Sequence, residues 1–390
     1  MTSNYDVVVV GAGIQGVGVA QAAAASGYSV LVLEKRAVAW ATSSRSSKLI
    51  HGGLRYLESA QFRLVRESLR ERALLLRNAP DLVRLVPFHI PVYRHTKRRP
   101  WQLRVGLSLY ALLGGLDASA RFRMLPRSQW RELDGLDTNG LQAVFRYYDA
   151  QTDDARLTAA VLRSAQNLGA QLACPAEFRA ALWERDAWTI RYHHAERDHE
   201  CRGRALVNAA GPWVNDVLKH VVPVQPPLAV DLIQGAHVVL PGKLERGIYY
   251  VEAPQDRRAV FLMPWPEGVL VGTTESPFHG DPSKVEPLPS EIAYLAETAQ
   301  RYFPAIATQP TSAFAGLRVL PQHAAGVFHR PRDTHIAGSE RTAPGLLTVC
   351  GGKLTGYRAT ADKVMARLAA RLPAHTPRAQ TEHLKLSAPN

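Results

Sequence analysis

A glycine-rich turn between a buried strand and a helix lies near the start of the chain, and it constrains the fold more than any other feature. The four valines at 7–10 predict a short strand buried on both faces, as in a parallel sheet. Gly11, Gly13 and Gly16 follow as G-x-G-x-x-G, and the alanine-rich run 17–25 predicts a helix. Together they predict a Rossmann-type dinucleotide-binding unit.

The spacing gives each of these residues a role. Gly11 permits the tight turn, Gly13 lets the backbone approach a pyrophosphate, and Gly16 lets the helix pack closely on the strand. The second strand, 28–33, ends in Glu34, 23 residues after Gly11, where an acid binds a ribose hydroxyl. An acid there disfavours NADP, because it would repel the 2′-phosphate. The motif alone leaves NAD and FAD open.

Composition narrows the partners and the cellular location. The 390 residues carry a formal net charge of +13, which favours a phosphorylated substrate or an anionic membrane. No nucleic-acid motif is found, so we expect no nucleic acid as partner. The three cysteines show no paired spacing, which predicts neither disulfides nor a metal site and is typical of the cytoplasm. We expect no signal peptide, because the first strand starts at once, and no spanning helix.

Segment 40–57 is the second candidate for a site. It is rich in small hydroxyl side chains, which donate hydrogen bonds to a bound pyrophosphate without adding bulk. Its second half places His51 and Arg55 four residues apart, on one side of a helical turn. The alternative is a polar loop before an amphipathic helix at 61–78. The cofactor-binding residues predicted in this segment are Thr42, Ser43, Ser47, Lys48 and Leu49.

Two runs in this region resemble the FAD-dependent glycerol-3-phosphate dehydrogenases, within the wider class of glycine oxidase and D-amino-acid oxidase flavoproteins. They are SKLIHGGLRYLE at 47–58 and FRLVRESLRER at 62–72. The resemblance implies an α/β fold: a Rossmann-type FAD-binding domain with an α+β substrate domain on a mainly antiparallel sheet. It implies oxidation of sn-glycerol 3-phosphate to dihydroxyacetone phosphate, with hydride passing to flavin N5 and electrons then to a quinone or oxygen.

Two later strand ends fit the same resemblance. Strand 204–210 ends at Gly211, which would contact the cofactor in this class of flavoproteins, although an ordinary strand and turn explain the composition equally well. A last strand meets Gly351 and Gly352, and a helix is predicted from 354 to 372. Backbone donors at that helix start would face the flavin's pyrimidine edge. The cofactor contacts implied there are Gly352, Leu354 and Thr355.

Arg318 is the main candidate for substrate binding. It is a cation in an apolar strand, which is costly unless an anion meets it, and a salt bridge to an internal carboxylate is the alternative. The resemblance implies that Arg318 and Arg55 hold a phosphate, with hydrogen bonds from Tyr56 and Thr274. The base that takes the hydroxyl proton is left open among His51, His237 and Lys353.

A basic cluster at 94–100 precedes a mostly apolar run at 101–116. The run is too short to span a bilayer, but it suits a helix lying in the plane of an anionic membrane. A core helix after a basic loop is the alternative. The resembling family is peripherally membrane-bound, so the expected location is the cytoplasm, with peripheral attachment to the inner face of the cytoplasmic membrane.

The predicted domains are discontinuous. Residues 1–75, 150–220 and 325–390 form the FAD-binding domain, and 76–149 and 221–324 form the substrate domain, while the oligomeric state is not predicted. The sequence departs from the family's usual Lys, hydroxyl residue and Asp at Gln234, Ala236 and Glu275. We expect these changes to leave FAD binding intact, but with them the resemblance does not fix which substrate binds. The alternatives are an FAD enzyme acting on a 2-hydroxy or amino acid, with Arg318 on the carboxylate, and a non-catalytic or RNA-associated flavin-binding protein.

Overall fold

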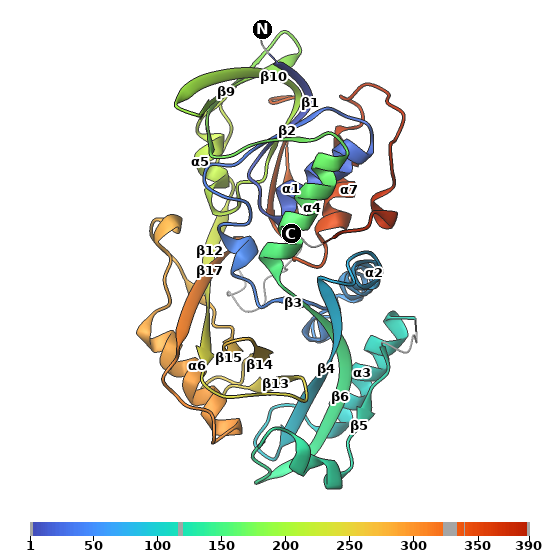
Figure 1. The fold of residues 1–390 in the computed structure, drawn as a ribbon, viewed down its shortest axis with the longest axis vertical. Helices are drawn as coiled ribbons and strands as arrows, with labels where there is room; N and C mark the ends of the chain where they lie inside the picture. The colour runs from blue at the N-terminus through green and yellow to red at the C-terminus, as the bar shows by residue number, and fades with distance from the viewer. Residues whose placement is uncertain (1–2, 116–119, 323–333, 339, 388–390) are drawn as a thin grey trace.

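The strands of the computed structural model form two sheets, one above the other in Figure 1. The structure describes residues 3–115, 120–322, 334–338 and 340–387. Parts of the domain prediction at 325–333, and Leu116 of the predicted membrane segment, lie outside these ranges. The chain passes between the sheets repeatedly, so that segments far apart in sequence meet where the sheets adjoin (Figure 1).

The upper sheet carries the glycine-rich turn. Its strands are β1 (Ser3–Val10), β2 (Val30–Leu33), β7 (Gln171–Ala173), β8 (Ala176–Glu184), β9 (Ala187–His194), β10 (Arg197–Asn208), β11 (Val221–Val222), β18 (Thr334–Ala337) and β19 (Leu346–Gly351). The order is β11-β8-β9-β10-β1-β2-β7, and β19 pairs with both β10 and β18. Strands β7, β2, β1, β10 and β19 are parallel to their neighbours in that group, which is the arrangement that a Rossmann unit requires.

Helices α1 (Ile14–Ala25), α4 (Asp154–Asn167) and α7 (Tyr357–Leu368) pack together against one face of this sheet (Figure 1). Strand β1 is buried because its valines face helices on one side and a second apolar cluster on the other: Val7 and Val9 belong to the first, Val8 to the second. The run of β-branched residues therefore matches a strand covered on both faces. The short helix α5 (Val214–Leu218) lies in the second cluster.

The lower sheet is mainly antiparallel, as predicted. Its strands are β3 (Leu49–Ile50), β4 (Val83–Tyr93), β5 (Arg123–Met124), β6 (Leu141–Thr152), β12 (Val230–Leu240), β13 (Ile248–Glu252), β14 (Ala259–Trp265), β15 (Gly268–Gly272), β16 (Ser276–Pro277) and β17 (Ser312–Pro321). Among the pairings of the described residues, β4 with β13 is the one parallel pair in this sheet.

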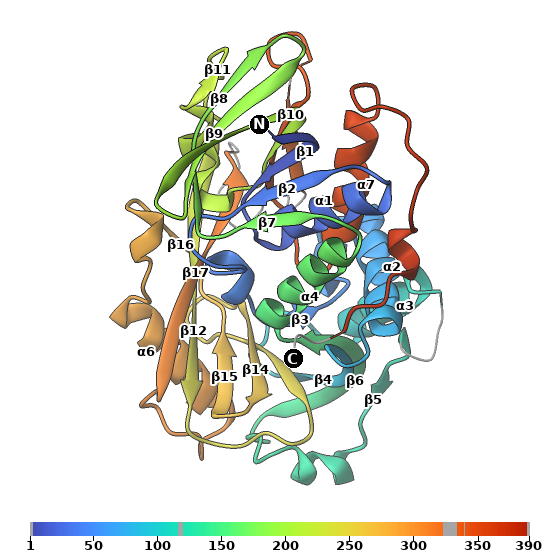
Figure 2. The ribbon, with the colours of Figure 1, turned by 45° about the horizontal axis from the view of Figure 1, so that its top comes forward.

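Helices cover the lower sheet on both sides. Helix α6 (Pro289–Tyr302) buries Leu295 and Ala299 against one face. Helices α2 (Phe62–Asn78) and α3 (Pro100–Leu113) pack on the other, and Figure 2 shows them on the opposite side from α6. Strand β3 pairs with β6 in this sheet although it falls within the predicted FAD-binding range 1–75, and β11 joins the upper sheet although it begins at 221. The domain boundaries themselves stay a prediction.

The C-terminal segment differs from expectation. The tail 373–390 is polar and contains proline, which predicts disorder, but residues 373–387 pack along the upper domain, and 388–390 lie outside the described residues. The backbone amide of Arg378 donates to the Ala25 carbonyl at 2.7 Å, and that of Leu386 donates to the Asn78 carbonyl at 2.8 Å. Leu386 is buried in the helical core. The last helix ends at Leu368, four residues before the predicted end.

Candidate active site

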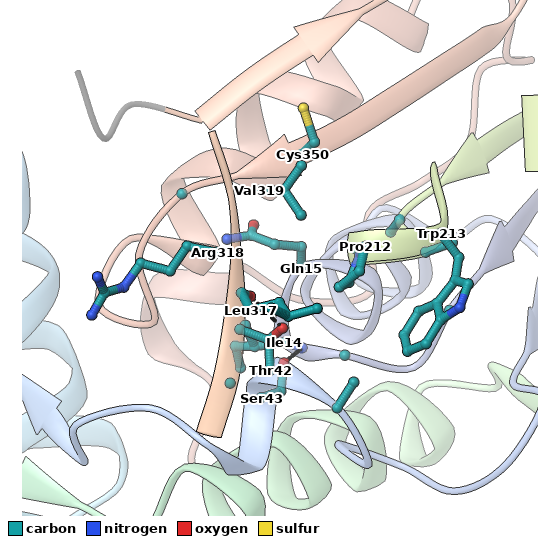
Figure 3. Close-up of a pocket in the computed structure, with 18 of the residues that line it drawn as sticks. Ile14, Gln15, Thr42, Ser43, Pro212, Trp213, Leu317, Arg318, Val319 and Cys350 are labelled. Atoms are coloured by element: carbon teal, nitrogen blue, oxygen red, sulfur yellow. Dashed lines mark hydrogen bonds between the residues drawn. The ribbon is translucent and has the colours of Figure 1, made fainter. Parts of the chain in front are cut away.

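A cavity of about 440 Å³ lies where the two sheets adjoin, a size typical of ligand sites. Its walls come from the β1–α1 turn, segment 39–56, the turn at 209–213, strand β17 and the turn at 349–355. In Figure 3 the Arg318 side chain extends from β17 away from Trp213, so these two residues mark opposite ends of the site. We call the end at Arg318 the arginine end.

The glycine-rich turn has the backbone that its motif predicts. Gly11 has φ +106°, and a Cβ there would lie 2.6 Å from the Ala209 carbonyl oxygen. A Cβ on Gly16 would lie 2.0 Å from the Gly11 carbonyl oxygen, so helix and strand meet through backbone. Gly11 and Gly13 line the cavity, and α1 begins just beyond them, so the helix N-terminus faces the space where a pyrophosphate binds.

Glu34 ends β2 beside this turn. One carboxylate oxygen accepts the Ala12 amide at 2.9 Å and the other accepts the Arg36 amide at 2.9 Å. Each oxygen keeps a further lone pair for a ribose hydroxyl. The cavity wall continues from Glu34 to Trp40 and Trp213, whose rings are 5.9 Å apart. Neither tryptophan has a predicted role, since a lone aromatic in a loop has no spacing signal.

The hydroxyl residues of segment 42–49 mostly fix the cavity wall. The Ser43 hydroxyl accepts the Ile14 amide at 2.9 Å, and the Thr42 hydroxyl donates to the Leu317 carbonyl at 2.7 Å, joining the segment to β17. Ser47 and Leu49 also lie on the wall. Lys48 does not: its buried Nζ pairs with Asp154 at 2.5 Å. Its predicted cofactor contact is therefore not supported by its position, because burial of an ammonium demands this internal acid.

The turn at 351–355 closes the cavity from the C-terminal side. Gly351 and Gly352 have φ +71° and +83°, which lets the chain reverse before α7. Lys353 Nζ donates to the Ser68 hydroxyl at 3.1 Å and lies 3.8 Å from the centroid of the Tyr56 ring. Thr355 accepts the His51 amide at 3.2 Å. Among the predicted residues, this turn contributes Gly352, Lys353, Leu354 and Thr355 to the cavity wall. Gly211, His51 and Tyr56 line the cavity from other parts of the chain.

The arginine end is built around one buried acid. Glu275 accepts an ion pair from Arg318 at 2.9 Å, from Arg258 at 2.8 Å and from Arg55 at 3.9 Å. The two predicted arginines therefore converge, and the internal salt bridge expected as the alternative for Arg318 is also present. Of these four residues, Arg318 is the one that lines the cavity. Arg258 was missed because it lies in a turn with no pattern.

Thr274 lies beside this cluster but not on the cavity wall. Its hydroxyl accepts the Ala236 amide at 2.8 Å and donates to Glu291 at 2.7 Å. Glu291 also accepts Gln234 at 2.6 Å, so these contacts join α6 to β12. The position of Thr274 supports a structural contact rather than the predicted contact with substrate.

His237 lines the cavity from β12. Its ring stacks on Phe314 with centroids 4.9 Å apart, and Nε2 lies 3.0 Å from the Ser47 hydroxyl. Burial, with the positive charges of Arg318 and Lys48, lowers the pKa of His237 to about 3. The ring is neutral at physiological pH, and an imidazole with so low a pKa is a weak base. The low pKa of His237 therefore favours His51 or Lys353 as the proton acceptor.

The site fits a flavin dinucleotide. A glycine turn without room for side chains, a helix N-terminus, an acid at the end of β2 and a second glycine turn all face one elongated cavity. The profile of the FAD dependent oxidoreductase family, DAO, matches residues 6–358. The chain belongs to this family. Its cofactor is therefore FAD, and its predicted class as an oxidoreductase is confirmed.

Relatives of this flavoprotein are longer than the chain itself. It is 38% identical over 375 residues to glycerol-3-phosphate dehydrogenase of Pseudomonas aeruginosa, covering 93% of this chain and 71% of that protein. It is 36% identical to D-erythritol 1-phosphate dehydrogenase of Brucella abortus, covering 93% of this chain and 73% of that protein. The resemblance drawn from residues 47–72 is confirmed by these matches.

The fold is also shared by solved flavoproteins. Reduced L-alpha-glycerophosphate oxidase of Mycoplasma pneumoniae with FAD bound has a TM-score of 0.76 at 16% identity, covering 99% of each chain. That identity shows the fold alone. The predicted α/β architecture is confirmed, with both parallel and antiparallel strands. Within the described residues, no helix is long and apolar enough to cross a bilayer. The roles of individual site residues stay predictions.

Proposed function

We propose that this flavoprotein oxidises sn-glycerol 3-phosphate to dihydroxyacetone phosphate. The observation that carries the proposal is the convergence of Arg55, Arg258 and Arg318 on Glu275, with Arg318 on the cavity wall. Three guanidinium groups gathered around one carboxylate favour an anionic ligand. Arginine also binds phosphate oxygens in pairs, which would orient the polyol. The names of the two relatives support the same class of substrate.

The protein's residues would bind, orient and deprotonate the polyol. Arg55 is the most exposed of the three arginines, with 36% of its side chain accessible, so it is placed to meet a ligand from solution. His51 and Tyr56 lie on the cavity wall next to it. We propose His51 as the group that takes the hydroxyl proton, because it lines the cavity and histidine is the side chain that most often serves as a general base. Bound FAD supplies the acceptor for the hydride that leaves C2.

The flavin absorbance tests this proposal directly. The purified holoprotein is mixed without oxygen with sn-glycerol 3-phosphate, D-erythritol 1-phosphate, and a panel of 2-hydroxy and amino acids. Bleaching of the flavin band by glycerol 3-phosphate at low concentration is expected. Preference for erythritol phosphate would keep the phosphate site and change the polyol. Reduction by a hydroxy or amino acid alone would establish the alternative enzyme, and no reduction at all would favour a non-catalytic flavoprotein.

We further propose that α3 lies against an anionic membrane, where a quinone would take the electrons. Trp101, Val105 and Leu112 on its outer side are 68%, 60% and 61% exposed, while Leu107 on its inner side is buried. Exposed Arg99 and Arg104 lie on the same helix or at its start. Apolar side chains beside basic ones are typical of an interfacial helix.

Vesicle binding tests the membrane proposal separately. The holoprotein should sediment with phosphatidylglycerol vesicles and not with phosphatidylcholine vesicles, and added salt should weaken binding. Replacing both Trp101 and Leu112 by Ser should abolish sedimentation while leaving flavin reduction by substrate unchanged. Equal recovery of wild type and variant with the anionic vesicles would contradict the proposal, and oxygen would then be the acceptor to test.

A further inference from the structure

The turn at 51–53 is held from behind by a buried tyrosine. Tyr110 lies on the inner side of α3 and is 1% exposed. Its hydroxyl accepts the Gly52 amide at 2.8 Å and donates to Asp149 of β6 at 2.7 Å. Arg72 of α2 donates to the other carboxylate oxygen of Asp149 at 2.5 Å. Three elements of the lower domain therefore meet at one backbone amide beside the cavity.

Burying these groups is costly, so their arrangement calls for a function. Asp149 and Arg72 are 1% and 2% exposed. Burial raises the pKa of Asp149, and the charge of Arg72 opposes this rise. A buried ion pair adds little stability compared with an apolar cluster of the same shape. The pair does fix the direction of the Tyr110 proton, because an ionised carboxylate only accepts. The tyrosine oxygen is then left to accept the Gly52 amide.

The turn that this amide belongs to sets the position of the substrate-binding residues. A Cβ on Gly52 would lie 2.5 Å from the Tyr110 hydroxyl, so the backbone is pressed against it. Gly53 follows with φ +82°, and the short helix η2 (Leu54–Leu57) then presents Arg55 and Tyr56. His51 is the first residue of the turn. A shift of the Gly52 amide would therefore move His51, Arg55 and Tyr56 together.

We propose that Tyr110, held by Asp149 and Arg72, is a positioning residue for the turn that carries His51, Arg55 and Tyr56. The kinetic part of this inference rests on the function proposed above; the structural part does not. Tyr110 itself is not among the described residues that line the cavity, and the hydrogen bonds of its hydroxyl go to Gly52 and Asp149. Its effect on activity would pass entirely through the 51–56 backbone.

Tyr110→Phe in the holoprotein tests this. It removes one hydroxyl and keeps the ring in the core. A misplacement of about 1 Å at reacting groups costs about 100-fold in rate, so we expect kcat/KM for glycerol 3-phosphate to fall by about 10- to 100-fold. The loss should include kcat, since His51 moves as well as Arg55. Flavin content should not change, and hydrogen exchange in peptides covering 50–57 should accelerate.

Tyr302→Phe is the matched control. Its hydroxyl is also buried and donates to a backbone carbonyl, that of Glu252, at 2.6 Å. Tyr302→Phe should lose about as much folding stability as Tyr110→Phe, while both kcat/KM and hydrogen exchange at 50–57 stay unchanged. Asp149→Asn is the second variant, because it keeps the tyrosine but removes the carboxylate that orients its proton. It should accelerate the same peptides, and it replaces Tyr110→Phe if that variant does not fold.

The two proposals fail in different ways. Unchanged exchange at 50–57 in the Tyr110 and Asp149 variants overturns the positioning role, whatever the substrate. Faster exchange with unchanged kcat/KM also overturns it, because the turn would then move without consequence. If wild-type flavin is not reduced by glycerol 3-phosphate, the proposed function falls, whereas accelerated exchange confined to 50–57 still supports the role of Tyr110 in holding the turn.

Discussion

The two ends of the cavity are built by different means. The part of the cavity around the glycine-rich turn, which we call the FAD side, uses backbone and small side chains. Gly11 and Gly13 come from one continuous turn, and Ser43 holds the Ile14 amide beside them. The arginine end uses long charged side chains from three separate parts of the chain, gathered on Glu275. The first end depends on the absence of side chains, and the second depends on charges that must be balanced.

This difference predicts how each end fails. Where backbone meets backbone, an added methyl group cannot be accommodated by rotating a side chain, so a small change is severe. Where several cations share one anion, removing one cation leaves the others in place and the loss is graded. Substitutions at the two ends should therefore separate cofactor content from substrate affinity.

The largest effect is expected at the FAD side. Gly11→Ala would place a Cβ 2.6 Å from the Ala209 carbonyl at φ +106°. Strain at such a position costs about 3 kcal/mol, which corresponds to about 100-fold in FAD affinity or more. The purified variant should be colourless and inactive. Gly106→Ala on α3, where a Cβ meets nothing within 4 Å, should stay yellow and active. Full flavin occupancy in Gly11→Ala would contradict the motif's role.

The next effect tests the proton acceptor between the two ends. His51→Gln should retain FAD, but the rate at which substrate reduces the flavin should fall by about 100-fold or more, as it does on loss of a general base. His237→Gln should lose far less activity, because a histidine with a pKa of about 3 is a weak base. A loss of this size in Lys353→Met but not in His51→Gln would assign the base to Lys353.

A graded effect is expected at the arginine end. Arg318→Gln should keep its flavin while kcat/KM for glycerol 3-phosphate falls about 10- to 100-fold, because hydrogen bonds to charged groups contribute about 1.5–3 kcal/mol. Arg246→Gln, whose side chain is 56% exposed, is the matched loss of one positive charge and should change nothing. If Arg318→Gln also lost its flavin, the two ends would not be independent.

The smallest effect concerns stability of the lower sheet at acidic pH. Burial lowers the pKa of His89 on β4 to about 4, with a contribution from Arg123. The unfolded chain binds this proton near pH 6.5, so the stabilisation is complete above that pH and is lost as the pH falls toward 4. At pH 5 this residue should reduce the unfolding free energy by about 2 kcal/mol.

Urea unfolding at pH 8 and pH 5 measures this term. His89→Phe should lose less stability between the two pH values than wild type does. Neither ring nitrogen of His89 has a hydrogen-bond partner among the described residues, so this substitution leaves no lost bond to replace. Exposed His335→Phe is the control for removing one histidine. An identical pH dependence in wild type and His89→Phe would show that His89 does not carry this term.

The sequence by itself determined the first two strands of the upper sheet, the FAD turn and the family. Val7 to Val10, the three glycines and Glu34 are close together along the chain, and steric rules for backbone fix what they build. The contiguous run at 47–58 was likewise enough to indicate a resemblance to the FAD-dependent glycerol-3-phosphate dehydrogenases. Local sequence also placed α2 to within one residue at each end.

Only the tertiary structure decided which charges meet. Lys48 was predicted to face the cofactor but pairs with Asp154, more than a hundred residues away. Thr274 was predicted to face the substrate but contacts Glu291, and the packing of the tail along Ala25 and Asn78 was not foreseen. The partners of a buried ion, a hydroxyl or a backbone amide are set by which strands and helices adjoin, and that information is not contained in local spacing.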